Sequence, residues 1–141
     1  MTKRKVDAVV AILQRGGRYL VGKRSLHRPV APGYWCPISG RLEPGETQAD
    51  AVVREVWEEV GLRVRASRKV AQCDTHDGTT LLHWWLVELS EDEQEARLAN
   101  DEHSELRWVT AEELERLEPA FAEDIAILLS WQEGRSRPMG S

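Results

Sequence analysis

The hydrophobic and polar positions along the chain predict one strongly amphipathic helix set among several strands. Between Ala49 and Val60 the apolar residues recur at three- and four-residue spacing, which is typical of a helix with one buried face. Thr47 and Asp50 have the spacing of a capping box, and Gly61 supplies a residue suited to a left-handed helix end. The pattern therefore predicts a helix from about Thr47 to Val60.

Shorter apolar runs on both sides of this helix predict strands. Two runs flank the turn residues Gly16 and Gly17 and indicate a hairpin, and a later run is apolar on both faces, as a central strand is. The expected strands cover 6–13, 19–23, 62–71, 80–89 and 105–109, with a loop over 25–34 and a short segment over 35–38. A short helix from Ala111 and an amphipathic helix over 120–133 complete the pattern.

The order of these elements indicates an α/β protein. Strands covered by helices without regular βαβ alternation are typical of an α/β/α sandwich with a mixed central sheet. At 141 residues and 41% hydrophobic content, the chain is long enough to bury a core. No repeat or linker interrupts it, so we expect a single domain over 1–141 with a frayed tail over 134–141.

The charge balance limits the classes of partner. A net charge of −5 argues against binding nucleic acid or an anionic membrane through bulk charge, so a phosphate ligand must be held by local groups. No apolar run is long enough for a membrane span, and no signal-peptide cleavage pattern follows the first apolar run, which predicts a cytoplasmic protein. Cys36 and Cys73 are then expected to be free thiols.

Three glutamates of the predicted helix form its most informative feature. Glu55, Glu58 and Glu59 stand at i, i+3 and i+4, so their carboxylates share the face opposite the apolar stripe. Such like charges destabilise a helix by a few tenths of a kcal/mol per pair, unless a hard divalent cation joins them. The alternative is a solvated acidic face, but Arg54 offers a guanidinium fork that pairs with a carboxylate and fixes its orientation.

The stretch 40–62 contains these residues within a longer pattern. It reads Gly, five residues, Glu, seven residues, Arg-Glu, an aliphatic, any residue, Glu-Glu, any residue, Gly and an aliphatic; the residues are Gly40, Glu46, Arg54, Glu55, Val56, Glu58, Glu59, Gly61 and Leu62. This is the Nudix box at every defining position, so the chain resembles the Nudix hydrolases over essentially its whole length. The resemblance implies their α/β/α fold and Mg²⁺-dependent hydrolysis of a phosphoanhydride, with Mn²⁺ as a substitute.

The resemblance also implies a role for each box residue. Glu55 would assist the deprotonation of water, although family members differ in which glutamate is the base, and Glu46 would position Arg54. Outside the box, Glu102 would complete a metal site or act as the base, with Asp101 and Glu105 as competitors and a solvated loop acid as the alternative. The residues implied to bind metal are Gly40, Glu55, Glu58 and Glu59.

Substrate contacts are less well defined by the sequence. Lys23, Arg24 and Arg41 are candidates for binding phosphate, with solvated surface cations as the alternative. Candidates for the base or leaving group are aromatic residues that also suit a core: Tyr34, Trp35, Trp85 and Phe121. We expect His103 to be a surface or substrate-edge histidine and no metal ligand, because the site is already rich in oxygen.

The substrate class follows only by elimination. Pro37-Ile38-Ser39-Gly40 replaces the common Pro-Gly-Gly before the box, and the markers of the ADP-ribose, diadenosine-polyphosphate and guanine-sanitising groups are missing. The chain is therefore similar to a MutT-like pyrophosphohydrolase that converts a nucleoside triphosphate to the monophosphate and pyrophosphate. Alternatives are an ADP-ribose or nucleotide-sugar pyrophosphatase and a non-catalytic nucleotide sensor, which the intact box disfavours. The resemblance also allows a homodimer.

Overall fold

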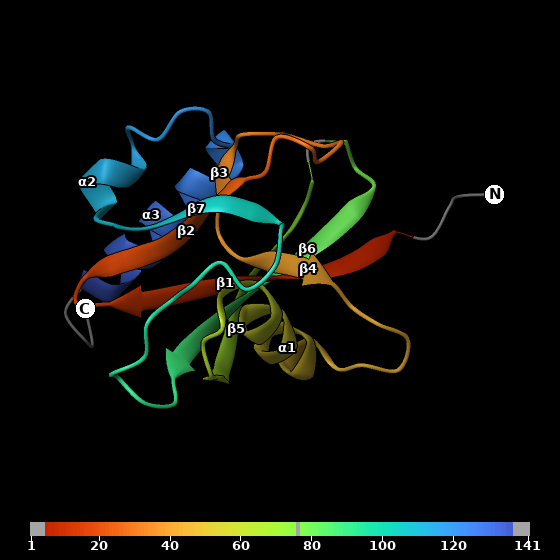
Figure 1. The fold of residues 1–141 in the computed structure, drawn as a ribbon, viewed down its shortest axis with the longest axis horizontal. Helices are drawn as coiled ribbons and strands as arrows, with labels where there is room; N and C mark the ends of the chain where they lie inside the picture. Colours follow the sequence, from red (N-terminus) through yellow and green to blue (C-terminus); the bar gives the residue numbers. More distant parts are fainter. Residues whose placement is uncertain (1–4, 76, 137–141) are drawn as a thin grey trace.

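The computed structural model describes residues 5–75 and 77–136, in which the sequence forms strands and helices close to those expected. Figure 1 shows their arrangement. The strands are β1 (Val6–Arg15), β2 (Arg18–Arg24), β3 (Trp35–Cys36), β4 (Ser39–Arg41), β5 (Val64–Asp74), β6 (Thr80–Leu89) and β7 (His103–Val109). The helices are α1 (Gln48–Val60), α2 (Ala111–Leu114) and α3 (Ala122–Ser136).

Strand β1 lies at the centre of a mixed sheet. It pairs in parallel with β6 and in antiparallel fashion with β2 and β4, while β5 lies on the far side of β6. Strand β2 also pairs with β3 and β7, which extend the sheet in the other direction. The predicted mixed sheet is confirmed, and so is the central position of the strand that is apolar on both faces, β6.

The predicted hairpin is confirmed only at its turn. Gly16 and Gly17 have φ values of 58° and 76°, the left-handed region that a two-residue turn needs. Beyond the turn, the β1–β2 register contains just two residue pairs, after which β2 diverges to pair with β3 and β7. Strand β4, which the sequence pattern did not predict, pairs with β1 next to the box helix instead.

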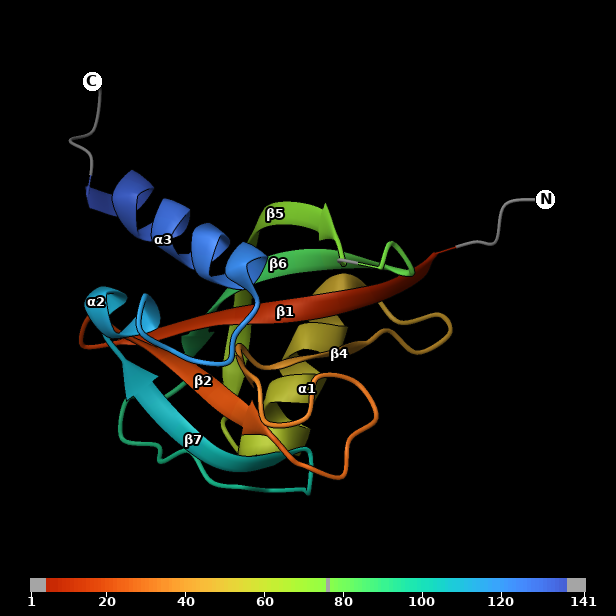
Figure 2. The ribbon, with the colours of Figure 1, turned by 90° about the horizontal axis from the view of Figure 1, so that it is seen from above.

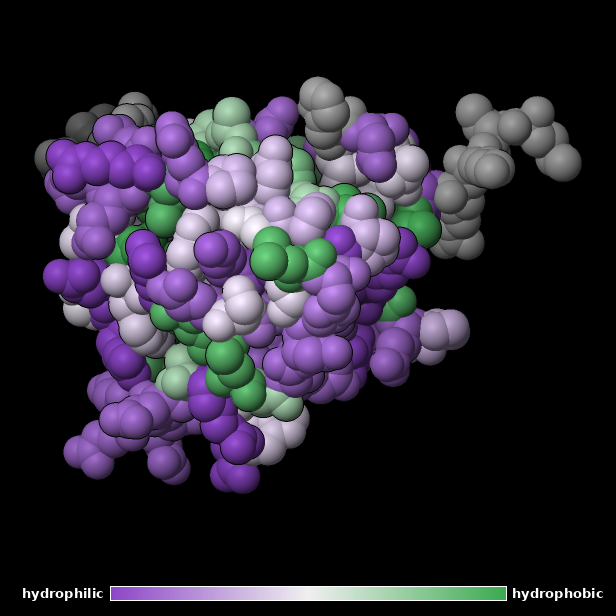
Figure 3. All heavy atoms as spheres, turned by 45° about the horizontal axis from the view of Figure 1, so that its top comes forward, coloured by the Kyte–Doolittle hydropathy of each residue, from purple (hydrophilic) through white to green (hydrophobic). Residues whose placement is uncertain are grey.

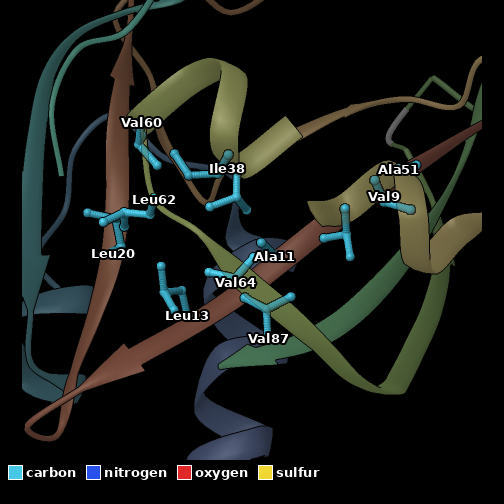
Figure 4. Packing of buried hydrophobic residues seen from close by; sticks show 12 residues of the cluster. Val9, Ala11, Leu13, Leu20, Ile38, Ala51, Val60, Leu62, Val64 and Val87 are labelled. Atoms are coloured by element: carbon cyan, nitrogen blue, oxygen red, sulfur yellow. The ribbon is translucent and has the colours of Figure 1, made fainter. Parts of the chain in front are cut away.

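Helices α1 and α3 cover opposite faces of the sheet, as Figures 1 and 2 show. One buried cluster joins α1 to β1, β5 and β6, and Figure 4 shows residues of this cluster. A second cluster joins α3 to the other face of β1 and β6 through Leu128, Ile12 and Trp84. The α/β/α sandwich expected from the element order is therefore confirmed.

The ends of the helices follow the predicted signals with one exception. At α1 the Thr47 side chain accepts a hydrogen bond from the Asp50 N–H at 3.1 Å, and Gly61 ends the helix with a φ of 67°. Helix α3 runs to Ser136 and so ends later than the predicted residue 133, and the predicted frayed tail beyond this end lies outside the described residues. Within 5–75 and 77–136, no helix has the length and apolar character needed to cross a bilayer.

The molecular surface gives no further support for a docking face. On the side seen in Figure 3, hydrophobic residues form small groups among mostly hydrophilic ones. The large exposed apolar side chains of the described residues are scattered over several elements: Val6, Leu26, Val30, Trp57 and Leu98. The homodimer stays a prediction.

Candidate active site

Arg54 connects the start of the box to its helix. The guanidinium binds both carboxylate oxygens of Glu46, at 2.7 and 2.8 Å, and donates to the backbone carbonyl of Arg41 at 3.0 Å. It also donates to Glu55 at 2.8 Å and Glu58 at 3.1 Å, and it forms a longer ion pair with Glu43 at 3.7 Å. The hydrogen bond from Arg54 is the main reason that the pKa of Glu46 falls to about 2. One arginine thus holds three carboxylates of the motif, as charge-assisted bidentate pairs do well.

Glu55 lies directly against the backbone of Gly40. A Cβ added to Gly40 would lie 2.0 Å from the carboxyl carbon of Glu55, so any other residue at this position would displace that carboxylate. Burial, and next the charge of Glu59, raise the pKa of Glu55 to about 7, although Arg54 opposes both effects. The opening glycine of the motif is therefore explained by close approach of a carboxylate and requires no unusual backbone angle.

Glu55, Glu58 and Glu59 of helix α1 form an acidic cluster, in which Glu59 is the most deeply buried carboxylate. Its side chain is 2% exposed, and burial followed by the charge of Glu102 raises its pKa to about 8. One oxygen, Oε1, lies 3.2 Å from Nε2 of His103, whereas Oε2 has no hydrogen-bond partner among the described residues. The surface position expected for His103 is wrong, because this residue is 4% exposed and begins β7.

Of the three acids proposed outside the box, Glu102 has an electrostatic effect on Glu59. Its charge raises the pKa of Glu59, and its own carboxylate pairs with Arg28 at 2.5 Å. Asp101 has an 88% exposed side chain near His27, and Glu105 pairs with Arg107 at 2.7 Å. The structure therefore favours Glu102 over both competitors.

The donor set fits a hard divalent cation, although no three His, Cys, Asp or Glu side chains in 5–75 and 77–136 are grouped as a ready-made metal site. Mg²⁺ is commonly held by one or two carboxylates, with waters and substrate phosphates completing its coordination. The unpartnered Oε2 of Glu59 and the pKa of Glu55, which burial and the charge of Glu59 raise despite the contact with Arg54, both indicate carboxyl groups that a cation would stabilise in their charged form. Glu58, with a 48% exposed side chain, lies at the outer side of this set.

A pocket of about 160 Å³ lies beside the acidic cluster. Its lining includes Ser39, next to Gly40, and also Arg24, Phe121 and Asp124. Arg24 lowers the pKa of Glu59 as well as that of Asp124, so its charge acts on both the acidic cluster and the pocket. Burial nevertheless raises the pKa of Asp124 to about 6.

Only some of the other predicted substrate contacts lie near this pocket. Lys23 and Arg41 are not among the residues lining this pocket, and Arg41 is exposed with its carbonyl bound to Arg54. The ring centroid of Tyr34 lies 4.9 Å from that of Phe121, which lines the pocket. Two other aromatic candidates are engaged elsewhere: Trp85 donates to Gln48, and Trp35 is buried beneath Arg107.

Two residues near the site, Arg28 and Asp124, could not be identified from the sequence. Arg28 lies in a loop without periodicity, and only the fold brings it to Glu102. Asp124 lies in the first turn of α3, where an acidic residue is ordinary and gives no signal of a pocket.

The acidic cluster predicts how stability depends on pH in the absence of divalent ions. The folded pKa values of Glu55 and Glu59, about 7 and 8, lie above their usual 4.5, so the folded state binds more protons than the unfolded state in this range. The free energy of unfolding should therefore fall as pH rises from 6.5 to 8. This window lies above 6.5, the ordinary pKa of His103, so the titration of that residue does not set the slope. Urea unfolding in EDTA would measure it, and a Glu55→Gln/Glu59→Gln variant should lose the slope; a parent slope of zero or the opposite sign contradicts the prediction.

Comparison with known proteins identifies the family of this chain. The NUDIX domain model matches residues 3–132. The nucleoside triphosphatase NudI of Enterobacter sp. (strain 638) is 33% identical over 125 residues, covering 82% of this chain and 89% of that protein. The CTP pyrophosphohydrolase of Escherichia coli (strain K12) is 33% identical over 110 residues, covering 77% of this chain and 78% of that protein.

A solved structure shares the fold. The crystal structure of a MutT protein from Methanosarcina mazei Go1 superposes with a TM-score of 0.83 at 22% identity, covering 97% of this chain and 99% of that one. The chain therefore belongs to the Nudix hydrolase family, whose members generally use a divalent metal. The family resemblance and the enzyme class predicted from the box are confirmed.

Proposed function

We propose that this protein hydrolyses a nucleoside triphosphate to the monophosphate and pyrophosphate in the presence of Mg²⁺, with Mn²⁺ as a substitute. The observation that carries the proposal is that Arg24 lines a pocket together with Phe121 while its charge also acts on Glu59 in the acidic cluster. A phosphate chain bound at the carboxylates would have its nucleoside end near this pocket. The guanidinium of Arg24 supplies a positive charge that can bind the phosphate chain between the carboxylates and the pocket.

Each box residue has a role in this reaction that follows from its contacts. When bound at the carboxylates, Mg²⁺ neutralises phosphate charge and lowers the pKa of a coordinated water. Arg54 and the backbone of Gly40 restrict Glu55 to one orientation, which suits a group that accepts a proton from the attacking water. Glu58 and Glu59 provide the remaining carboxylates for the metal, and Glu102 is a further candidate ligand.

The substrate class draws on the relatives and on the pocket. Two proteins that are 33% identical are named for action on a nucleoside triphosphate and on CTP. The Phe121 ring and the half-buried carboxyl of Asp124 give the pocket an aromatic face and a hydrogen-bonding group, which a nucleobase requires. We place Lys23 and Arg41 as secondary phosphate contacts, because neither lines the pocket.

A substrate panel tests the proposal. Phosphate release in Mg²⁺ with added pyrophosphatase should be highest for one or more nucleoside triphosphates, and Glu58→Gln should lower it at least about 100-fold. Glu58 is half exposed, so this variant should keep its fold. Glu88→Gln, on β6 and also exposed, serves as the matched control.

The other outcomes identify the alternatives. Preferred turnover of ADP-ribose or a nucleotide sugar would replace the substrate class but keep the metal-dependent hydrolase. Thermal stabilisation by a nucleotide without turnover of any substrate would favour the non-catalytic sensor.

A further inference from the structure

The contact between His103 and Glu59 joins two distant parts of the fold. Glu59 lies on α1 and His103 begins β7, and both side chains are 2% exposed. Nε2 of the imidazole lies 3.2 Å from Oε1 of the carboxylate. When the Glu59 carboxylate is ionised it can only accept a hydrogen bond, so the His103 ring then donates to it from Nε2.

Gly22 leaves the space that the His103 ring occupies. It lies on β2, which pairs with β7, and a Cβ added there would be 2.5 Å from Nδ1 and 2.8 Å from two ring carbons of His103. Because the ring is buried, it has no solvent-facing orientation to which a larger residue could displace it. Gly22 and Glu59 therefore define the ring position from two sides.

The two carboxylate oxygens of Glu59 have different surroundings. Oε1 is held by His103, whereas Oε2 is buried without a partner. A buried carboxylate oxygen without a hydrogen bond is costly unless a ligand satisfies it. Fixing one oxygen also removes rotational freedom from the other before any ligand binds.

We propose that His103 is a positioning residue that orients Glu59 to bind the divalent cation through Oε2, and that Gly22 is required for this placement. The inference rests on the proposed metal-dependent function. His103 itself contacts neither substrate nor metal in this proposal. Groups that hydrogen-bond metal ligands in this way typically contribute about 10- to 100-fold to metal affinity.

Three substitutions separate the hydrogen bond from the volume of the ring. His103→Gln can place an amide N–H near the position of Nε2, His103→Asn has the same chemistry but is too short, and His103→Leu has no donor. Mn²⁺ binding to the free protein, followed by the electron paramagnetic resonance signal of unbound Mn²⁺, gives a readout independent of turnover. Leu and Asn should weaken binding about 10- to 100-fold, and Gln should restore it to within about threefold of the parent.

A fourth substitution tests the ring position. Gly22→Ala should weaken Mn²⁺ binding as His103→Leu does, because the added methyl displaces the ring. Unfolding in EDTA verifies that each variant is folded; if the Leu variant is not, the difference between Gln and Asn decides. Equal Mn²⁺ affinity in parent, Asn and Leu variants, or in parent and Asn alone, would overturn the inference. A parent that neither binds Mn²⁺ nor hydrolyses any substrate would instead refute the proposed function.

Discussion

Replacing Glu55 by glutamine should lower the turnover number by about 10²- to 10⁴-fold while leaving the fold intact. The amide keeps the shape of the side chain but cannot accept a proton from water and is a poorer metal ligand. The loss should not come from unfolding, because the carboxylate is held with a raised pKa and is unfavourable in the metal-free protein. Initial rates at saturating Mg²⁺ on the preferred substrate measure the effect.

The stability of the same variant provides the control. In EDTA at pH 8, Glu55→Gln should unfold at a temperature no lower than that of the parent, since it removes one of two crowded charges. Glu88→Gln should change neither rate nor stability noticeably, because its pairing with Arg65 is exposed. A Glu55→Gln enzyme with more than about a tenth of the parental rate would exclude Glu55 as the base.

Adding one methyl group at Gly40 should cost about 100-fold in turnover. The new Cβ would lie 2.0 to 2.4 Å from the carboxyl atoms of Glu55, so the carboxylate must leave its position beside Arg54. Misplacing a reacting group by about 1 Å is sufficient for a loss of that size. Single-turnover rates of Gly40→Ala at saturating Mg²⁺ would check the prediction.

Gly78 offers a matched glycine for comparison. A Cβ at Gly78 would meet no atom within 4 Å, but its φ of 73° makes alanine unfavourable there. Gly78→Ala should therefore lose stability by about 1 kcal/mol and keep full activity. If Gly40→Ala retained the parental rate, Glu55 would not need the orientation seen in the structure.

The box helix and its charged face could be predicted because their signals are local. Thr47 and Gly61 mark the two ends of α1, and the spacing of three glutamates fixes their common face without reference to the remainder of the chain. The Glu46–Arg54 contact was also expected from the motif, and the structure contains it. The catalytic and metal-binding roles of these residues stay predictions until the variants are measured.

The remaining parts of the site could not be predicted because they depend on strand pairing. His103 reads as a surface residue in a polar loop, yet the antiparallel pairing of β2 and β7 buries it next to Gly22. Arg28 reaches Glu102 only because their two loops meet. Neither contact has a periodicity or spacing in the sequence that identifies it.

The pairing of β1 with β6 has a consequence for the growing polypeptide. The motif is complete once residue 62 has been made, but Val6 must wait for Thr80 before its parallel ladder begins. Glu59 then lacks its imidazole partner until His103 and β7 have been added. Such non-local pairing is slow to form. A nascent or truncated chain that ends before β7 therefore carries the whole motif without the imidazole that contacts Glu59, so the motif alone does not make the complete site.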